Sequence, residues 1–300
     1  MTSKIFCTFL LILLIQFSFA QGCSDAGFCT ISSLKPSDKD SAHTKLNQLK
    51  VGSFIGSADQ SILVYGAYLE YNRQLNSKFG ADIKLNSLAQ KGNGISVYGL
   101  SDLFVNVNFA ATPSLSLTLG TKIPLSGANR TLDGLPLPMD YQSSLGTFDI
   151  IFGIGYQIKK FQLVAAIQQP ITQNKNTFSH LLYPESSLLN SFQSTNQFER
   201  SGDVLLRFSY PINVLKNVVL TPSLLPIYHL SEDRYYDGFS MKEIEGSQGL
   251  TLNGNLYIDC TLDEKSSLQL NAGIPFLFRE ARPDGLTRSF IATLEYKIKF

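Results

Sequence analysis

The chain has 300 residues, of which 44% are apolar and only 16% are charged. Soluble domains carry about 25% charged residues, and no apolar run of about 20 residues, the length of a membrane helix, lies beyond the N-terminus. The 25 basic and 24 acidic residues nearly cancel, so the chain lacks the basic surface that a nucleic-acid partner requires. These values favour a membrane β-barrel, whose lipid-facing and lumen-facing residues alternate along each strand.

Residues 1–20 predict a cleaved secretory signal peptide. Lys4 precedes the apolar run 9–15, and Ser18-Phe19-Ala20 supplies a small-x-small cleavage site. We expect cleavage between Ala20 and Gln21, and export from the cytoplasm. A membrane anchor is one alternative, although the apolar run is short for it. Lipid modification of Cys23 is a second alternative.

Residues 21–46 are polar and carry Pro36, which predicts a periplasmic N-terminal tail or a plug inside a barrel. Cys23 and Cys29 enclose a short loop that could close as a disulfide in an oxidising periplasm. Two free thiols fit the sequence equally well. The spacing matches no metal-binding or redox motif, so the sequence predicts no metal site and no cofactor.

From residue 47 onward, apolar and polar residues alternate with period two, which predicts β-strands with one apolar face. In the segment 148–158, for example, Phe148, Ile150 and Phe152 alternate with Asp149 and Gly153. The predicted strands are 51–56, 62–72, 79–88, 102–109, 115–120, 148–158, 161–167, 203–210, 218–230, 250–259, 268–278 and 290–300.

The connections between these strands alternate in length. Those near residues 75, 112, 160, 216 and 264 are short, and those near 135, 185 and 240 are long. Outer-membrane barrels have short periplasmic turns and long extracellular loops. The sequence therefore predicts an all-β fold over residues 47–300, a transmembrane antiparallel up-and-down β-barrel of about twelve strands (ten to fourteen), with both termini periplasmic. A soluble β-sandwich is the alternative fold.

The last strand ends on an aromatic residue, with Tyr296, Ile298 and Phe300 on its apolar face. This pattern resembles the assembly signal of bacterial outer-membrane barrels. The resemblance implies insertion by the barrel-assembly machinery and outer-membrane lipid as a partner. The chain has no Trp, so we expect Tyr71, Tyr156 and other Tyr and Phe residues near strand ends to form the interfacial girdle.

Two segments resemble the FadL-type channels for fatty acids and aromatic hydrocarbons, including the group named for the meta-pathway of phenol degradation. One is Gly120-Thr121-Lys122-Ile123-Pro124, at the end of a predicted strand. The other is the Leu-Gly-x-x-x-Asp pattern of residues 145–149, which opens the next strand. The resemblance implies passive uptake of small apolar or amphipathic molecules.

Two groups of residues are candidates for contact with such a solute. The apolar loop near residue 185 could cover an entry site, although packing against neighbouring loops explains its composition as well. Some predicted lumen positions are also apolar or aromatic. The candidate substrate residues are Phe104, Tyr257, Leu181, Leu182, Tyr183, Leu188, Leu189 and Phe192. The predicted lumen charges are Asp102, Asp149, Arg207 and Asp259, which either pair structurally or line a constriction.

Two other functions fit a barrel of this size. One is an outer-membrane lipid-modifying enzyme, which would need a Ser–His pair oriented by a third polar group. Of His43, His180 and His229, only His229 is suitably placed, and the sequence has no Gly-x-Ser-x-Gly motif. We therefore predict no catalytic activity. The other is a structural or adhesive surface barrel without transport. The sequence does not predict an oligomeric state.

Overall fold

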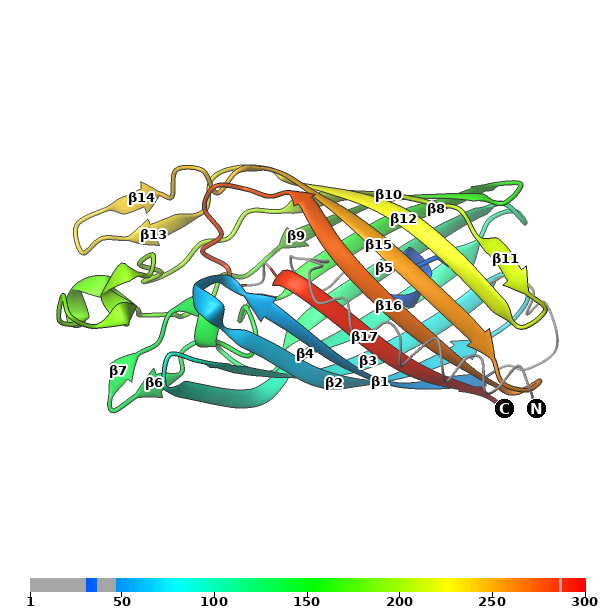
Figure 1. The fold of residues 1–300 in the computed structure, drawn as a ribbon. Coiled ribbons are helices and arrows are strands. Elements are labelled where there is room, and N and C mark those ends of the chain that lie inside the picture. Colours follow the sequence, from blue (N-terminus) through cyan, green and yellow to red (C-terminus); the bar gives the residue numbers. More distant parts are fainter. Residues whose placement is uncertain (1–30, 37–46, 286–287) are drawn as a thin grey trace.

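The computed structural model describes residues 31–36, 47–285 and 288–300. Among these residues, thirteen strands form one antiparallel sheet, which closes on itself because β10 also pairs with β12 (Figure 1). The strands are β1 Asn47–Ala58, β2 Leu63–Gln74, β3 Phe79–Gly92, β4 Ile95–Ala110, β5 Leu115–Pro124, β8 Asp149–Ile158, β9 Phe161–Pro170, β10 Asp203–Ser209, β11 Ile212–Leu215, β12 Val218–His229, β15 Gly249–Thr261, β16 Ser266–Leu277 and β17 Arg288–Lys299.

Twelve of these strands close the ring, because β11 pairs only with β12 and continues the line of β10. The ring is completed between the first and the last strand. The β1–β17 register runs from Gln48 opposite Lys299 to Ala58 opposite Arg288. The predicted fold, an antiparallel up-and-down barrel of about twelve strands, is confirmed.

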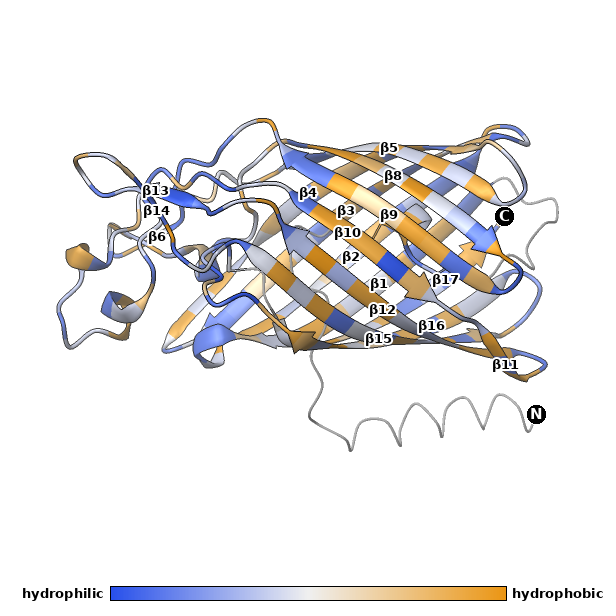
Figure 2. Cartoon of the chain, turned by 90° about the horizontal axis from the view of Figure 1, so that it is seen from above, coloured by the Kyte–Doolittle hydropathy of each residue, from blue (hydrophilic) through white to orange (hydrophobic). Residues whose placement is uncertain are grey.

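Apolar and polar residues alternate along the strands of the wall (Figure 2), and many large apolar side chains are exposed on its outer face. In β8, Ile150 and Phe152 are each 42% exposed, whereas Asp149 and Ile151 beside them are fully buried in the interior. An outward apolar face of this kind is typical of strands that span a membrane. None of the helices that the structure describes is long and apolar enough to cross a membrane.

The two ends of the barrel differ in the length of their connections. The C-terminus and the short turns, such as 75–78 and 159–160, lie at one end, which we call the turn end (Figure 1). The connections 125–148, 171–202 and 230–248 and residues 278–285 lie at the other end, which we call the loop end, together with the short turns 59–62 and 93–94. They contain the hairpins β6–β7 (Thr131–Leu132, Leu135–Pro136) and β13–β14 (Arg234–Tyr236, Met241–Glu243).

Strand β4 begins at Ile95, earlier than the predicted start at residue 102. Its pairing with β3 shifts so that Ser101 and Asp102 together oppose one residue, Asn86. Such a β-bulge reverses which positions face inward. Before it Ile95 and Val97 are buried, and after it Asp102 and Phe104 are buried. A search of the sequence for strict alternation therefore recognises only the part of β4 that follows the bulge, from residue 102 onward.

The outer face of the barrel gives a first testable prediction. Leu119 lies in the middle of β5 and is 60% exposed. A charge at the bilayer midplane costs a barrel about 2–4 kcal/mol, so we expect Leu119→Arg to lower the free energy of unfolding from lipid vesicles by that amount. Leu125 is 40% exposed just beyond the strand, and Leu125→Arg serves as the control, with a loss below about 1 kcal/mol. Equal small losses in both variants would mean that this face does not contact lipid.

Candidate functional site

The lumen is the candidate functional site, and one side of its interior is apolar. Phe104 of β4 and Ile151 of β8 point inward and are fully buried. They belong to one buried cluster with Ala166 of β9 and with Leu225 and Ile227 of β12. These strands belong to one side of the ring, so the cluster forms an apolar surface on that side of the barrel interior, which we call the waist.

A short segment of the chain that is not part of the barrel wall packs against this waist. Residues 31–36, which include the short 3₁₀ turn η3 Ser32–Leu34, lie inside the barrel (Figure 1). Ile31 and Leu34 are buried and belong to the same apolar cluster as Phe104 and Ile151. A side chain at Gly153 would lie 2.6 Å from Cδ2 of Leu34. The missing side chain at Gly153 therefore provides the space that Leu34 occupies.

Polar contacts attach the segment to the wall on several sides. Lys35 Nζ lies 3.3 Å from Glu295 Oε2, and Ser32 Oγ donates a hydrogen bond of 2.5 Å to Glu70 Oε1. Arg207 Nη1 donates to the main-chain carbonyl of Leu34 at 2.5 Å. Since β2, β10 and β17 all contribute, residues 31–36 are held across the width of the barrel.

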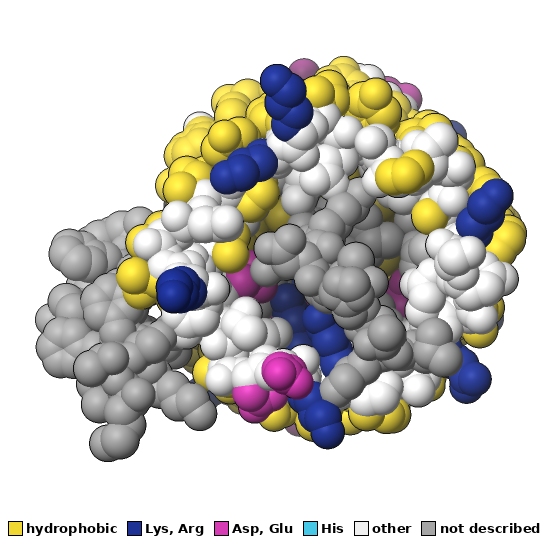
Figure 3. Space-filling view, turned by 90° about the vertical axis from the view of Figure 1, so that its right-hand side faces the viewer, with side chains coloured by type: hydrophobic (Ala, Val, Ile, Leu, Met, Phe, Trp, Pro, Cys, Tyr) yellow, Lys and Arg dark blue, Asp and Glu magenta, His cyan; other side chains and the backbone are white. Residues whose placement is uncertain are grey.

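The lumen nearer the turn end contains further charged side chains. Lys50 Nζ donates to Glu70 Oε1 at 3.0 Å, and the Lys84 ammonium lies 4.0 Å from the ring centroid of Tyr68. The Tyr68 hydroxyl donates to Glu295. Basic and acidic side chains are visible inside the opening when the barrel is seen from this end (Figure 3). Alternation along β1, β2 and β3 would have revealed Lys50, Glu70 and Lys84 as inward charges, which the sequence analysis did not include.

All four predicted lumen charges lie on inward positions. Asp149 forms an ion pair of 2.9 Å with Lys122 of β5, and both side chains are fully buried. Asp102 accepts hydrogen bonds from Ser101 and from Ser144 of the 125–148 loop. Asp259 lies 3.2 Å from Lys297. Every one of these charges therefore has a partner in the wall, a loop or the inner segment, which fits the structural interpretation rather than a water-exposed charge ring.

The candidate residues for substrate contact divide into three groups. Phe104 and Tyr257 lie in the lumen and are buried. Tyr183, whose hydroxyl donates to Pro136 O at 2.8 Å, packs with Leu189 and Phe192 in a second cluster at the loop end. Three residues remain exposed on the loop surface: Leu181, Leu182 and Leu188. The 171–202 loop therefore uses part of its apolar surface for packing and leaves part of it open.

The remaining predicted positions lie elsewhere. Tyr296 and Phe300 are exposed on the outer face of β17, together with the partly buried Ile298. The cleavage site Ala20–Gln21 and the cysteines Cys23 and Cys29 lie outside the described residues. Within the described part of the chain, no group of His, Cys, Asp and Glu could hold a metal ion.

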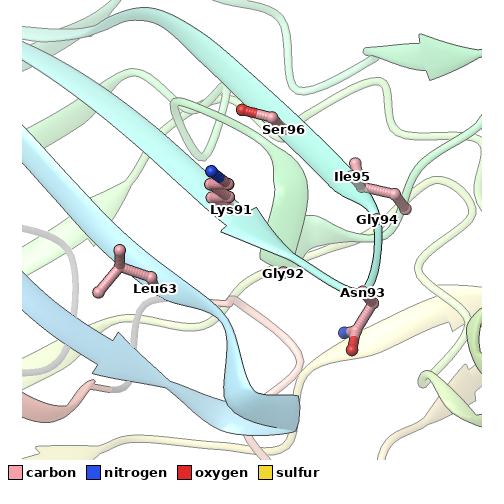
Figure 4. Close-up of a pocket in the computed structure, with 7 residues that line it drawn as sticks. All are labelled: Leu63, Lys91, Gly92, Asn93, Gly94, Ile95 and Ser96. Atoms are coloured by element: carbon pink, nitrogen blue, oxygen red, sulfur yellow. The ribbon is translucent and has the colours of Figure 1, made fainter.

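A pocket of about 460 Å³ lies at the rim of the loop end rather than in the lumen (Figure 4). It is formed by Leu63 of β2 and the β3–β4 turn from Lys91 to Ser96. Leu63, Lys91 and Ser96 are exposed. None of the residues predicted to contact a substrate lines it.

The two described histidines do not form a catalytic triad. Both ring nitrogens of His229 face carboxylates, Nδ1 at 2.7 Å from Asp203 and Nε2 at 2.8 Å from Asp233. His229 therefore has no ring nitrogen left to activate a nucleophile. His180 Nδ1 lies 2.7 Å from Ser194 Oγ on the 171–202 loop. No hydrogen bond joins a carboxylate to His180 among the described residues, so the orienting third group is missing there.

No protein-family model matches the chain. No curated protein matches it either. Among solved structures, the fold is similar to the COG4313 outer membrane channel from Pseudomonas putida F1. The TM-score is 0.62 at 13% identity, and the match covers 89% of this chain and 99% of the channel. At this identity the similarity establishes the fold alone.

Two further solved structures match at a lower level. The translocator domain of the autotransporter NalP from Neisseria meningitidis has a TM-score of 0.47 at 9% identity, covering 87% of this chain and 90% of the domain. The toluene transporter TbuX of Ralstonia pickettii has a TM-score of 0.41 at 8% identity, covering 86% and 90%. At these TM-scores neither match supports an argument about this chain.

The buried Lys122–Asp149 pair gives a second prediction. Removing one partner of a buried ion pair leaves an uncompensated charge, which costs about 3–5 kcal/mol, whereas replacing both partners is often close to neutral. We expect Lys122→Met to lower the free energy of unfolding by about 3–5 kcal/mol, and Lys122→Met with Asp149→Asn to recover most of it. The measurement is denaturant unfolding of all four members of the cycle in detergent. Additive losses would show that the two charges do not interact.

Proposed function

We propose that this protein is a bacterial outer-membrane β-barrel that acts as a passive channel for small apolar or amphipathic solutes. The predicted signal peptide would direct its export, and Tyr296, Ile298 and Phe300 would be read by the barrel-assembly machinery. The closed ring and its apolar outer face support insertion into lipid, since only closed β-structures satisfy every strand edge there. The fold similarity to a solved outer-membrane channel agrees with this assignment.

The apolar waist is the observation that carries the proposal. A water-filled porin has a polar interior, whereas Phe104, Ile151 and Leu225 form a buried apolar surface inside this barrel. An apolar solute passing through would exchange water for this surface and so gain hydrophobic stabilisation. The aromatic ring of Tyr257, with the Arg207 guanidinium carbon 6.0 Å from its centroid, adds a polar group for amphipathic solutes.

Residues 21–46 would act as a plug of this channel. The six described residues at positions 31–36 occupy the waist, and Leu34 fills the space beside Gly153. A solute crossing the lumen would have to displace this segment or pass beside it. Ile31 and Leu34 are themselves apolar, so an apolar solute could replace the contacts that they make with the wall.

Exposed leucines at the loop end would provide the entry surface. Leu181 is 76% exposed, and Leu182 and Leu188 are also exposed on the same loop. Exposed apolar groups on a loop can bind an apolar solute before it enters.

Two alternative functions make predictions that differ from those of a channel. A structural or adhesive barrel is favoured by the filled lumen, and it predicts no solute uptake. A lipid-modifying enzyme would need a different arrangement of His229, because both of its ring nitrogens face carboxylates.

Uptake by intact cells tests the proposal. Phospholipid vesicles are themselves permeable to hydrocarbons, so the protein should be produced in cells whose outer leaflet of lipopolysaccharide provides the barrier. Entry of a labelled monoaromatic hydrocarbon is compared with entry of a sugar of similar size. We expect the protein to accelerate the hydrocarbon only. Acceleration of both solutes would indicate a general porin, and acceleration of neither would favour the structural barrel.

A disulfide tether between the plug and the wall gives the third prediction. Leu34→Cys and Gly153→Cys would join η3 to β8 in a chain whose native cysteines are replaced by serine. We expect hydrocarbon uptake to fall to that of cells without the protein when the tether is oxidised, and to return when a reductant opens it. Each single variant is the matched control. Equal uptake in the oxidised and reduced double variant would mean that residues 31–36 do not block the path.

A further inference from the structure

A buried ionic network lies at the loop end, outside the waist and its plug. His229, the last residue of β12, is its centre, with Asp203 at the start of β10 on one side and Asp233 of the 230–248 loop on the other. The side chain of His229 is only 1% exposed, and both carboxylates are fully buried. One imidazole therefore bridges two carboxylates that belong to different elements.

Two arginines extend the network to two more loops. Arg200, near the end of the 171–202 loop, donates to Asp203, and its Nε lies 3.6 Å from Asp284. Arg279 Nη2 lies 3.0 Å from the same Asp284, and its Nη1 lies 3.9 Å from Asp233. Three of the long connections are thus joined through one set of buried charges.

The geometry requires a protonated His229. An ionised carboxylate only accepts hydrogen bonds, and Asp203 and Asp233 also accept from Arg200 and from the Ser201 main-chain N–H. Each ring nitrogen of His229 must then carry a proton. With an imidazolium, three positive groups face three carboxylates among the described residues of the network. Without that proton, the carboxylates of Asp203 and Asp233 point at a neutral ring, which can donate a hydrogen bond to only one of them.

Two further carboxylates at this end of the barrel, those of Asp284 and Glu232, are also ionised. Burial alone would raise the pKa of Asp284, but the guanidinium groups of Arg279 and Arg200 bring that pKa well below its usual range. Glu232 stands next to Asp233 and accepts hydrogen bonds from Ser247 Oγ and from three main-chain N–H groups. Burial raises the pKa of Glu232, but together these hydrogen bonds bring it below its usual value. The carboxylates of Asp284 and Glu232 are therefore ionised at neutral pH.

The same loops cover the mouth of the barrel. Phe198, Ile244 and Ala281 come from the three connections that the network joins. Phe198 and Ile244 are buried in one cluster with Leu205 and Leu225 of the lumen wall, and Ala281 packs against it. Holding the network together therefore keeps apolar loop residues in place over the lumen.

We propose that the His229 network is a proton-dependent latch that holds the three loops closed over the mouth of the barrel. This inference rests on the proposed channel function and concerns the regulation of that channel. Protonated His229 ties β10, β12 and the three loops together. Loss of its proton as the pH rises leaves Asp203 and Asp233 facing a neutral imidazole, and the loops separate. The latch is closed on the acidic side and open on the alkaline side.

The fourth prediction tests the latch by its effect on loop opening at neutral pH. His229→Gln removes the positive charge between the two carboxylates, so we expect backbone amides of residues 230–248 and 278–285 to exchange hydrogen at least about tenfold faster than in the wild-type protein. His180→Gln is the matched control, because His180 contacts Ser194 on the exposed loop. Its exchange in both segments should match the wild type. Unchanged exchange in His229→Gln would overturn the proposal.

A conductance profile in planar bilayers provides a second, independent readout. It is recorded with a variant in which residues 31–36 are replaced by a flexible Gly/Ser segment, so that the plug does not block ion flow. We expect conductance to rise as the pH increases and the imidazole between the two carboxylates loses its proton. Asp233→Asn keeps an acceptor for Nε2 but removes one negative charge, so the rise should move at least about one pH unit lower. A merely structural role for Asp233 would not move the midpoint, and an unshifted midpoint would overturn the proposal.

The two proposals fail in different ways. If amide exchange and conductance follow His229 and pH while no hydrocarbon enters the cells, the latch stands and the proposed cargo is wrong. If hydrocarbon enters but neither exchange nor conductance responds to His229, the latch is wrong and the channel function stands.

Discussion

Pairing of backbone hydrogen-bonding groups is the constraint on which the rest of the structure depends. A strand in hydrocarbon has no water to satisfy an exposed edge, so the sheet must close. Here the closure joins the first strand to the last, with residues 48–58 of β1 opposite 288–299 of β17. No strand of the ring then has a free edge along its paired length, and the outward face is left to meet lipid with apolar side chains.

Closure creates an interior that the wall alone does not fill. Eight-stranded barrels are just filled by their own side chains, and larger barrels enclose cavities or channels. In this twelve-stranded ring the space at the waist is occupied by residues 31–36, which pack Ile31 and Leu34 against the apolar wall. Loops complete the filling at the loop end. An interior filled by separate segments can be emptied without unfolding the wall, which is what a channel with a plug needs.

The interior charges divide into pairs that secure the wall and groups that secure movable parts. Lys122 and Asp149 join neighbouring strands β5 and β8. Lys35 and Glu295 join the inner segment to β17, and the His229 network joins three loops to β10 and β12. Buried ion pairs add little net stability compared with apolar residues. Their position at the inner segment and at the loop end fits the proposed roles of these parts, which would have to be released when a solute passes.

The sequence by itself determined the strands, the inward or outward direction of their residues and the lengths of the connections. These features are local, because alternation with period two decides which face a residue takes whatever its neighbours are. Alternation assigned Phe104, Tyr257, Asp149 and Arg207 to the lumen face, and all four are buried in the structure. The alternation is interrupted where strand pairing adds a residue, as at the bulge of β4.

Only the tertiary structure decided which inward residues meet. Lys35 and Glu295 are 260 positions apart and become partners because the barrel closes around residues 31–36. His229 and Asp203 meet because β10 and β12 pair across the 26 residues that separate them. The exposure of Leu181 and the burial of Phe192 likewise depend on how the loop packs on its neighbours. Alternation assigns a face, but contact across the lumen depends on the ring's closure and register, which no short segment encodes.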